Sequence, residues 1–544
     1  MLKKVNRKFI LFFLLLGILS SFKVYRDSKY IVGNMPYPQH VDEYHVLINA
    51  INMINNQNFY PGILCYPSLP IYFNASVIYV SQFLEDLFNI SKVIKLDNQS
   101  YPFYKEYDLV LFAKLITYTL SLLILLGLCF IVLKLTNCYV SSIICFILAS
   151  FSQLFTYHSR EYVNIDLFAT FFVILNIFYF VYFFQSKLSY RKLIIAGIFT
   201  GFTISSKYPH GLIILIYFWS ILSIQGNFIN KITNCLLVLL VAITTTLMCC
   251  PYIVIFFDKW LIEIVNQSKI YNKGWPGYTV DPGIQNLLIQ VNQIISEFGH
   301  FVFFSFLCGL FFLLKSKRNF AIPVLIYFFV FLFYFTSHSV NLVRNLLPLY
   351  IIYAMIGSLG FCQLLNYFKK FLPSSLIILI CAILTCITFP SEKALRVFLA
   401  DKETRNQLTD YINTSIPKGC NIVISSEIGL DTSKLNDYSV SEVNFLNDDR
   451  MSLNPFVSEI SNKDDFFVYP IFSNDMRWPD ADRHAQQVNK SLHSTNPLLH
   501  LEGRVGGSYS YINLSRPGIQ VNSHPTSPWG NPSIIVSRGL EVSF

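Results

Sequence analysis

Charged residues are scarce in this chain of 544 residues: only 13% are Asp, Glu, Lys or Arg, whereas 53% are hydrophobic. Because soluble globular domains carry roughly 25% charged residues, a single soluble domain of this size is excluded. Apolar runs that approach or exceed the roughly 20 residues a helix needs to cross a bilayer recur along residues 1–390. The composition therefore predicts a mainly α-helical, polytopic membrane protein.

Other familiar signals are also missing. The 12 cysteines lie mostly inside apolar runs, where they act as small hydrophobic residues, so no disulfide framework is expected. No small-residue cleavage site follows Ser20 and Ser21, which favours an uncleaved first span over a signal peptide. The net charge of +9 needs no nucleic-acid partner, because much of the basic excess lies in short loops between the apolar runs.

We expect about eleven transmembrane helices, at residues 9–22, 108–134, 138–156, 163–184, 192–206, 208–224, 232–257, 296–314, 320–336, 346–367 and 373–389. The short connections on one side are all basic, which by the positive-inside rule places the N-terminus in the cytoplasm. Lys23, Arg26 and Lys29 disagree with this orientation, because it puts them in an outer loop.

The expected spans divide the chain into two parts. Residues 1–390 would form a transmembrane domain whose outer loop, 23–107, contains amphipathic stretches at 41–58 and 66–88 that suit helices on a membrane surface. Residues 391–544 would form a small extracytoplasmic α/β domain. Its predicted elements are a helix at 401–415 and strands at 421–425, 466–472, 508–513 and 532–537.

Acidic and basic residues from distant segments fall on the predicted outer side of the membrane. They are Asp42, Glu43, Lys114, Arg160, Asp166, Lys207 and Arg344. A carboxylate inside an apolar span, such as Asp166, needs a partner and usually has a function, and Arg160 is the expected partner. Each residue alone also has an ordinary explanation, as part of an exposed acidic loop or as a cation at the end of a span.

Taken together, these residue types suit chemistry on a lipid-linked phosphate. Cations at this depth can hold the phosphodiester of a polyprenyl-phosphate sugar and stabilise its departure. A nearby carboxylate can deprotonate an acceptor hydroxyl. His40 and His45 beside the acidic pair could instead bind a divalent metal, although no HExxH or tetrahedral Cys/His set supports this, and no other cofactor is expected.

Several short motifs follow one another in a fixed order. They are Asp42-Glu43, Tyr66-Pro67-Ser68-Leu69-Pro70-Ile71-Tyr72, His158-Ser159-Arg160 with Asp166, residues 196–202 leading to Lys207-Tyr208, and Arg344-Asn345-Leu346-Leu347-Pro348. In this order they resemble the GT-C glycosyltransferases of the protein O-mannosyltransferase and lipid A aminoarabinose transferase type. Residues 401–424 also resemble the entry of that family's C-terminal domain.

The resemblance implies an inverting transfer of a sugar from a polyprenyl-phosphate carrier to an acceptor protein, lipid or glycan. Asp42 would be the base that activates the acceptor, with Glu43 beside it and Asp166 as the second acid of the cavity. Tyr66 and His45 would lie on the acceptor loop. The cations expected to face the lipid phosphate are Lys114, Arg160, Lys207 and Arg344.

The departures from the family pattern also carry information. Ser68 replaces the usual second proline, and Tyr66 stands where the aminoarabinose transferases have a lysine, which argues against lipid A modification. The later loops lack the C-terminal repeats of eukaryotic protein mannosyltransferases. A bacterial inner membrane is the expected location, with an ER membrane as the alternative that the sequence leaves open.

Two other functions compete with this interpretation. A transporter or lipid-linked sugar flippase would show inverted repeats and broken helices at the bilayer midplane, and the sequence indicates neither. A C-terminal binding module could use the spans as an anchor, but eleven spans are far more than an anchor needs.

Overall fold

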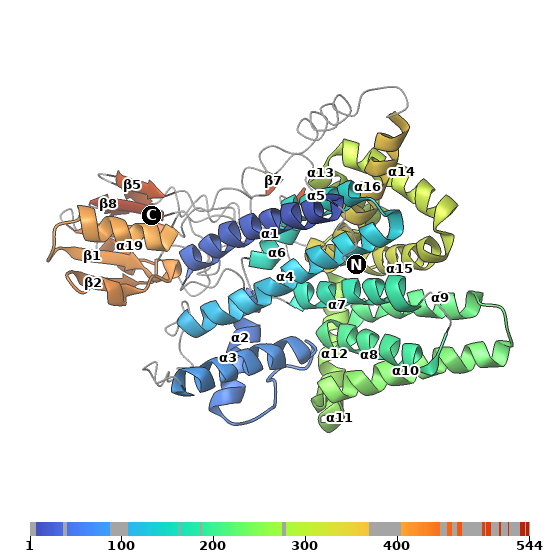
Figure 1. Ribbon diagram of the computed structural model, residues 1–544. Coiled ribbons are helices and arrows are strands. Elements are labelled where there is room, and N and C mark those ends of the chain that lie inside the picture. Colours follow the sequence, from blue (N-terminus) through green and yellow to red (C-terminus); the bar gives the residue numbers. More distant parts are fainter. Residues whose placement is uncertain are drawn as a thin grey trace.

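The computed structural model describes residues 7–35, 41–87, 107–160, 163, 165–184, 188–274, 279–368, 404–445, 454–459, 465–470, 492–494, 497–501, 511–512, 520–521, 534–538 and 540–542. Up to residue 368 the described chain is almost entirely helical (Figure 1). Its helices are α1 (Arg7–Asn34), α2 (Val41–Asn55), α3 (Leu69–Leu87), α4 (Tyr107–Thr136), α5 (Tyr139–Phe151), α6 (Gln153–Arg160), α7 (Ile165–Tyr179), η1 (Phe180–Phe184), α8 (Tyr190–Ser206), η2 (Tyr208–Ile214), α9 (Leu215–Ser223), α10 (Phe228–Cys249), α11 (Tyr252–Ile255), α12 (Phe257–Lys273), α13 (Ile284–Phe298), α14 (His300–Ser316), α15 (Arg318–Thr336), η3 (Val343–Leu346) and α16 (Leu347–Phe368).

The described helices confirm the predicted fold class, a mainly helical multi-pass membrane protein. Six are long and apolar enough to cross a bilayer, and there are eight spans if each of two bent helix pairs counts as one. The expected number of eleven is not confirmed: α8 and the η2–α9 segment are shorter than a full span, and residues 373–389 lie outside the described residues. The predicted domain boundary at residue 390 also lies outside them.

Helix α1 is longer than predicted. The expected first span ended at Phe22, but the helix continues to Asn34 and carries Lys23, Arg26 and Asp27 inside the protein. Lys23 and Arg26 both form ion pairs with Asp27, which compensates their charge within the helix bundle. The assignment of Lys23 and Arg26 to an outer loop was therefore wrong, and the two residues do not count against the predicted orientation.

Two pairs of consecutive apolar helices are sharply bent at a short break, a feature that the sequence did not indicate. Helices α5 and α6 meet at 68° around Ser152, and α13 and α14 meet at 108° around Gly299, whose φ of +81° suits glycine. The two breaks are joined, because Glu297 Oε1 accepts hydrogen bonds from Ser152 Oγ (2.8 Å) and from the Leu154 backbone N–H (2.9 Å). Glu297 thus supplies an acceptor to the first turn of α6, which would otherwise lack one.

Close helix packing inside the bundle depends on glycine. A Cβ added at Gly197 or Gly201 of α8 would lie 2.8 Å from a backbone oxygen of α10. A Cβ at Gly360 of α16 would overlap the Ser305 carbonyl oxygen of α14. Small residues at such positions allow helix backbones to approach closely, which is a main source of attraction between helices in lipid.

The predicted amphipathic stretches form α2 and α3, which pack beside the N-terminal part of α4 at one end of the bundle (Figure 1). Their core contains Leu47, Ile71, Ile78 and Ala113. The β-sheet of the C-terminal part, drawn in orange, lies beyond the C-terminal end of α1 (Figure 1). Asn406 Nδ2 donates hydrogen bonds to the carbonyl oxygens of Gly33 and Met35, at 3.1 and 2.9 Å, and so ties the two parts together.

The C-terminal part is a mixed α/β structure, as predicted. The sheet has the order β2 (Ser439–Val443), β1 (Asn421–Ser425), β3 (Phe466–Pro470), β8 (Ile534–Arg538) and β5 (Pro497–Leu501). Strand β1 is parallel to β2 and β3, whereas β8 is antiparallel to β3 and β5. Helix α19 (Thr404–Ser415) packs Leu408 and Ile412 into the same core as the sheet.

Candidate functional site

Glu43 and Lys114 form a buried ion pair between α2 and α4. The Lys114 Nζ lies 2.8 Å from Glu43 Oε1, and both side chains are almost completely buried. The second half of the predicted acidic pair therefore anchors its helix to the bundle. Asp42 precedes Glu43 in the first turn of α2, and its side chain lies outside the described part of the chain.

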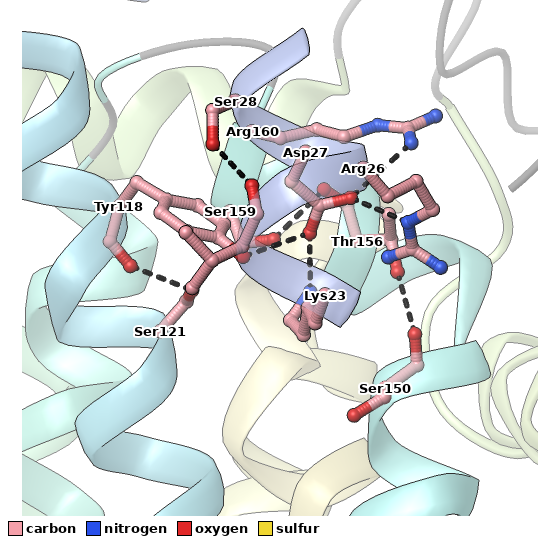
Figure 2. A network of polar contacts seen from close by, with 11 residues as sticks. Lys23, Arg26, Asp27, Ser28, Tyr118, Ser121, Ser150, Thr156, Ser159 and Arg160 are labelled. Atoms are coloured by element: carbon pink, nitrogen blue, oxygen red, sulfur yellow. Dashed lines mark hydrogen bonds and ion pairs between the residues drawn. The ribbon is translucent and has the colours of Figure 1, made fainter. Parts of the chain in front are cut away.

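Asp27 is the centre of a second cluster, which the sequence analysis did not identify as part of the site. Figure 2 shows its carboxylate between Lys23, Arg26 and Arg160. The three ion pairs have N···O distances of 2.6, 2.7 and 3.5 Å, respectively. The Tyr118 hydroxyl of α4 donates a fourth contact at 3.1 Å. The sequence signal that could have identified this cluster is the spacing of four residues between Lys23 and Asp27, which places both side chains on one face of a helix.

Asp166 forms a third cluster with two predicted cations. Its carboxylate is paired with Lys207 and lies 3.9 Å from the Arg344 Nε. The Lys207 ammonium also donates to Asn345 Oδ1 (2.7 Å), and Asn345 Nδ2 donates to the Tyr271 hydroxyl (3.1 Å). Asn345 and Tyr271 were missed as site residues, although Asn345 stands inside the motif that contains Arg344.

The pairing of Asp166 differs from the prediction. Among the described residues, Arg160 forms an ion pair with Asp27, whereas Asp166 pairs with Lys207 and Arg344. Asp166 follows Arg160 by six positions, but α6 ends at Arg160 and α7 begins at Ile165, so the two side chains are not on one helix. The expectation that Arg160 is the partner of Asp166 was therefore wrong.

Three residues that are close in sequence, Arg160, Val163 and Asp166, each contact a different one of the three clusters. Arg160 contacts Asp27, the Val163 backbone N–H lies 3.5 Å from Glu43 Oε1, and Asp166 holds Lys207. The predicted acids and bases whose side chains are described therefore lie near one another, although they come from α2, α4, α6, α7, the α8–η2 junction and η3. Those acids and bases whose side chains are described form separate ion-paired groups instead of one open ring of cations.

The four predicted cations differ in their access to solvent. The side chains of Lys114 and Arg160 are 4% and 3% exposed, whereas those of Lys207 and Arg344 are 12% and 16% exposed. A ligand phosphate can reach a cation only where the side chain is accessible. Lys207 and Arg344 are therefore better placed to receive an anion than Lys114 and Arg160.

The remaining predicted residues lie near the same end. His45 is exposed on α2, and its carbonyl accepts a hydrogen bond from Asn49 Nδ2 (2.6 Å). Tyr66 is partly buried against the core of α2 and α3. His40 lies outside the described residues, and within them no three His, Cys, Asp or Glu side chains gather to hold a metal ion. A divalent metal at His40 and His45 therefore stays only an alternative interpretation.

Residues 83–261 match the family model described as dolichyl-phosphate-mannose-protein mannosyltransferase. Over these residues the chain is similar to that family. The match includes Lys114, Arg160, Asp166 and Lys207, whereas Asp42, Glu43 and Arg344 lie outside it. It confirms the GT-C resemblance that the motifs indicated.

Solved structures with a similar course of the chain include ArnT and an archaeal oligosaccharyltransferase. ArnT from Cupriavidus metallidurans bound to undecaprenyl phosphate has a TM-score of 0.48 and 10% identity, over 98% of both chains. The archaeal oligosaccharyltransferase AglB from Archaeoglobus fulgidus, in complex with an inhibitory peptide and a dolichol-phosphate, has a TM-score of 0.46 and 12% identity, over 91% of this chain and 73% of that one. No role of a residue follows from likeness at these scores. No curated protein sequence matches the chain.

The buried Glu43–Lys114 pair makes a prediction for stability. Lys114→Met should lower the free energy of unfolding by about 3–5 kcal/mol, because it leaves the Glu43 carboxylate buried without its cation. The double variant Glu43→Gln/Lys114→Met should recover most of that loss. The measurement is denaturant unfolding of the purified protein in detergent.

A matched control is Lys418→Met, which removes a cation from an exposed pair with Asp437 and should leave stability unchanged. A double variant that is as unstable as Lys114→Met alone would contradict the pairing.

Proposed function

We propose that the chain is an integral membrane glycosyltransferase that transfers a sugar from a polyprenyl-phosphate donor to an extracytoplasmic acceptor. The observation that carries the proposal is the Asp166–Lys207–Arg344 cluster. It presents two partly accessible cations at the end of an apolar helix bundle. The match to a mannosyltransferase family whose description names a dolichyl-phosphate-linked sugar supports the lipid donor. The acceptor would be a protein, lipid or glycan.

In the proposed reaction the acceptor hydroxyl attacks the anomeric carbon of the donor sugar and inverts its configuration. The acceptor proton passes to the carboxylate of Asp42, acting as general base. The bond between the anomeric carbon and the phosphate oxygen breaks, and the polyprenyl phosphate leaves with its electron pair. Lys207 and Arg344 stabilise the negative charge on that phosphate.

The other site residues would position these groups. Asp166 holds Lys207 and Arg344 side by side, and the Glu43–Lys114 pair fixes the first turn of α2, from which Asp42 comes. Arg160, held by Asp27, and Lys114 would add positive potential behind the phosphate. No step of this scheme requires a metal ion.

A transporter or flippase remains the competing proposal, because the two bent helix pairs are a feature that such proteins use. Both bends, however, are tied to each other through Glu297, Ser152 and Leu154. A rigid junction of this kind suits a fixed scaffold better than a moving gate. The family match also favours the transferase.

Removal of the proposed base gives a direct test. Asp42→Asn should lower the turnover of sugar release from a polyprenyl-phosphate-linked sugar by about 10²–10⁴-fold, the usual effect of losing a general base. The measurement is release of radiolabelled sugar by the purified protein, beginning with mannose as the donor sugar. Asp258→Asn, at an exposed position of α12, is the matched control and should keep full turnover. Undiminished turnover of Asp42→Asn would remove Asp42 from this role.

The proposed phosphate-binding cations give a second test. Lys207→Ala and Arg344→Ala should each weaken binding of polyprenyl phosphate by about tenfold or more, since a charge-assisted hydrogen bond contributes roughly 1.5–3 kcal/mol. Lys315→Ala, at an exposed position of α14, should bind like the wild type. Titrations of both site variants that coincide with the wild type would show that the phosphate binds elsewhere.

We also propose that the site and the C-terminal part face away from the cytoplasm in a bacterial inner membrane, because the basic connections follow the positive-inside rule in that orientation. In intact cells a membrane-impermeant maleimide should then label Lys418→Cys, an exposed position of the C-terminal part. Lys317→Cys, between α14 and α15, should react only after permeabilisation. The reverse pattern would invert the topology.

A further inference from the structure

The loop between α2 and α3, residues 56–68, has no regular structure of its own, yet a distant helix holds its backbone. Glu263 Oε2 of α12 accepts hydrogen bonds from two successive backbone N–H groups, those of Leu64 (2.7 Å) and Cys65 (2.8 Å). Hydrogen bonds to an ionised carboxylate are shorter and stronger than neutral ones. The Glu263 side chain therefore holds the loop backbone just before Tyr66.

The same loop residue is held from its other side. The Leu64 carbonyl accepts a hydrogen bond from the Tyr208 hydroxyl (3.1 Å), and that hydroxyl accepts one from Trp260 Nε1 (3.2 Å). Trp260 and Glu263 are three residues apart on α12 and share a face. Tyr208 directly follows Lys207, so these contacts connect the loop to the cation of the Asp166 cluster.

The loop also folds back on α2. At Gly62 the backbone has a φ of +77°, and an added Cβ would lie 2.5 Å from Asn49 Oδ1. Asn49 is one helical turn beyond His45, whose carbonyl it contacts. A side chain at position 62 would therefore clash with the helix that carries Asp42 and His45.

Helix α12 itself has no buried residue. Phe257, Leu261, Ile262 and Val265 are all exposed, so the helix gains little from packing against the rest of the protein. Segments with few buried apolar contacts open at low free energy. The position of α12 relative to the loop consequently depends on polar contacts such as those of Glu263 and Trp260.

We propose that Glu263 is a positioning residue for the acceptor side of the site. Glu263 holds the 56–68 loop against α12 and next to α2, the helix that carries Asp42. The proposal rests on the proposed function, and it takes the loop that carries Tyr66 as the acceptor loop, as the resemblance implies. Glu263 touches neither the donor phosphate nor the reacting atoms in this scheme. It acts through the conformation of Leu64, Cys65 and the adjoining Tyr66.

The test uses three variants of the full-length protein in detergent. Glu263→Ala removes both hydrogen bonds, whereas Glu263→Gln keeps a carbonyl oxygen that can accept them without the charge. Asn266→Ala lies three residues further along α12, is exposed, and serves as the matched control. Hydrogen–deuterium exchange at Leu64 and Cys65, binding of polyprenyl phosphate, and turnover of sugar release from a polyprenyl-phosphate-linked sugar are measured for each.

Exchange at Leu64 and Cys65 should be at least about tenfold faster in Glu263→Ala, intermediate in Glu263→Gln and unchanged in Asn266→Ala. Turnover should fall in the same order, while the affinity for polyprenyl phosphate stays within about twofold of the wild type. Partial rescue by glutamine together with an unchanged donor affinity is not expected of a general loss of structure.

The Cys65 thiol supplies a reaction-independent readout of the same contact. Burial, and then the neighbouring Glu263 carboxylate, raise the pKa of this free thiol. Since only the thiolate reacts, the lower pKa expected in Glu263→Gln should speed alkylation of Cys65 by iodoacetamide at pH 8, measured by peptide mass spectrometry.

Three results would overturn the proposal. Exchange at Leu64 and Cys65 in Glu263→Ala that equals the wild type would show that Glu263 does not hold the loop. Faster exchange with wild-type turnover would show that the loop position does not matter for the reaction. Weaker binding of polyprenyl phosphate in proportion to the lost turnover would place Glu263 on the donor side.

A wild-type protein that releases no sugar would instead refute the proposed function. The exchange and alkylation results would still decide whether Glu263 contacts the loop.

Discussion

The pairing of buried charges is the constraint on which the site depends. A carboxylate or ammonium group inside an apolar helix bundle is costly unless an opposite charge lies beside it. In this protein Asp27, Glu43 and Asp166 are each paired with at least one cation from another helix, and Asp27 also with two from its own. These pairs therefore determine which helices meet at this end of the bundle.

The pairs also separate supporting groups from groups that a ligand can reach. Lys114 and Arg160 are enclosed with their carboxylates and hold α4 and α6 in place. Lys207 and Arg344 share Asp166 but keep part of their side chains accessible. An arriving phosphate would compete with Asp166 for these two cations, and the carboxylate would keep them ordered before the lipid binds. Such preorganisation reduces the cost of arranging charge during the reaction.

Helix α12 gives the same end of the bundle a second kind of support. Its exposed apolar side chains suit the boundary between lipid and water, while Glu263, Trp260 and Tyr271 reach toward the loop and the Asp166 cluster. The helix is attached by hydrogen bonds rather than by a buried core. Its placement is therefore sensitive to single polar substitutions in a way that α16, which is buried along most of its length, is not.

The sequence alone determined the class of the protein and most of its helices, because apolar length and the turn residues between spans are local properties. The ranges predicted around α4, α7, α15 and α16 agree closely with the structure, and the strand at residues 421–425 agrees residue by residue. The prediction that acids and bases on the same side of the membrane lie close together also holds for Asp166, Lys207 and Arg344, which are neighbours in the structure.

Only the tertiary structure decided which acid meets which base. Arg160 pairs with Asp27 rather than Asp166, because the chain ends a helix between them and α1 continues far enough to present Asp27. Long-range packing, which no local pattern encodes, also decided two other features. These are the helix breaks at Ser152 and Gly299, and the contact of Glu263 with a loop about 200 residues away in the sequence.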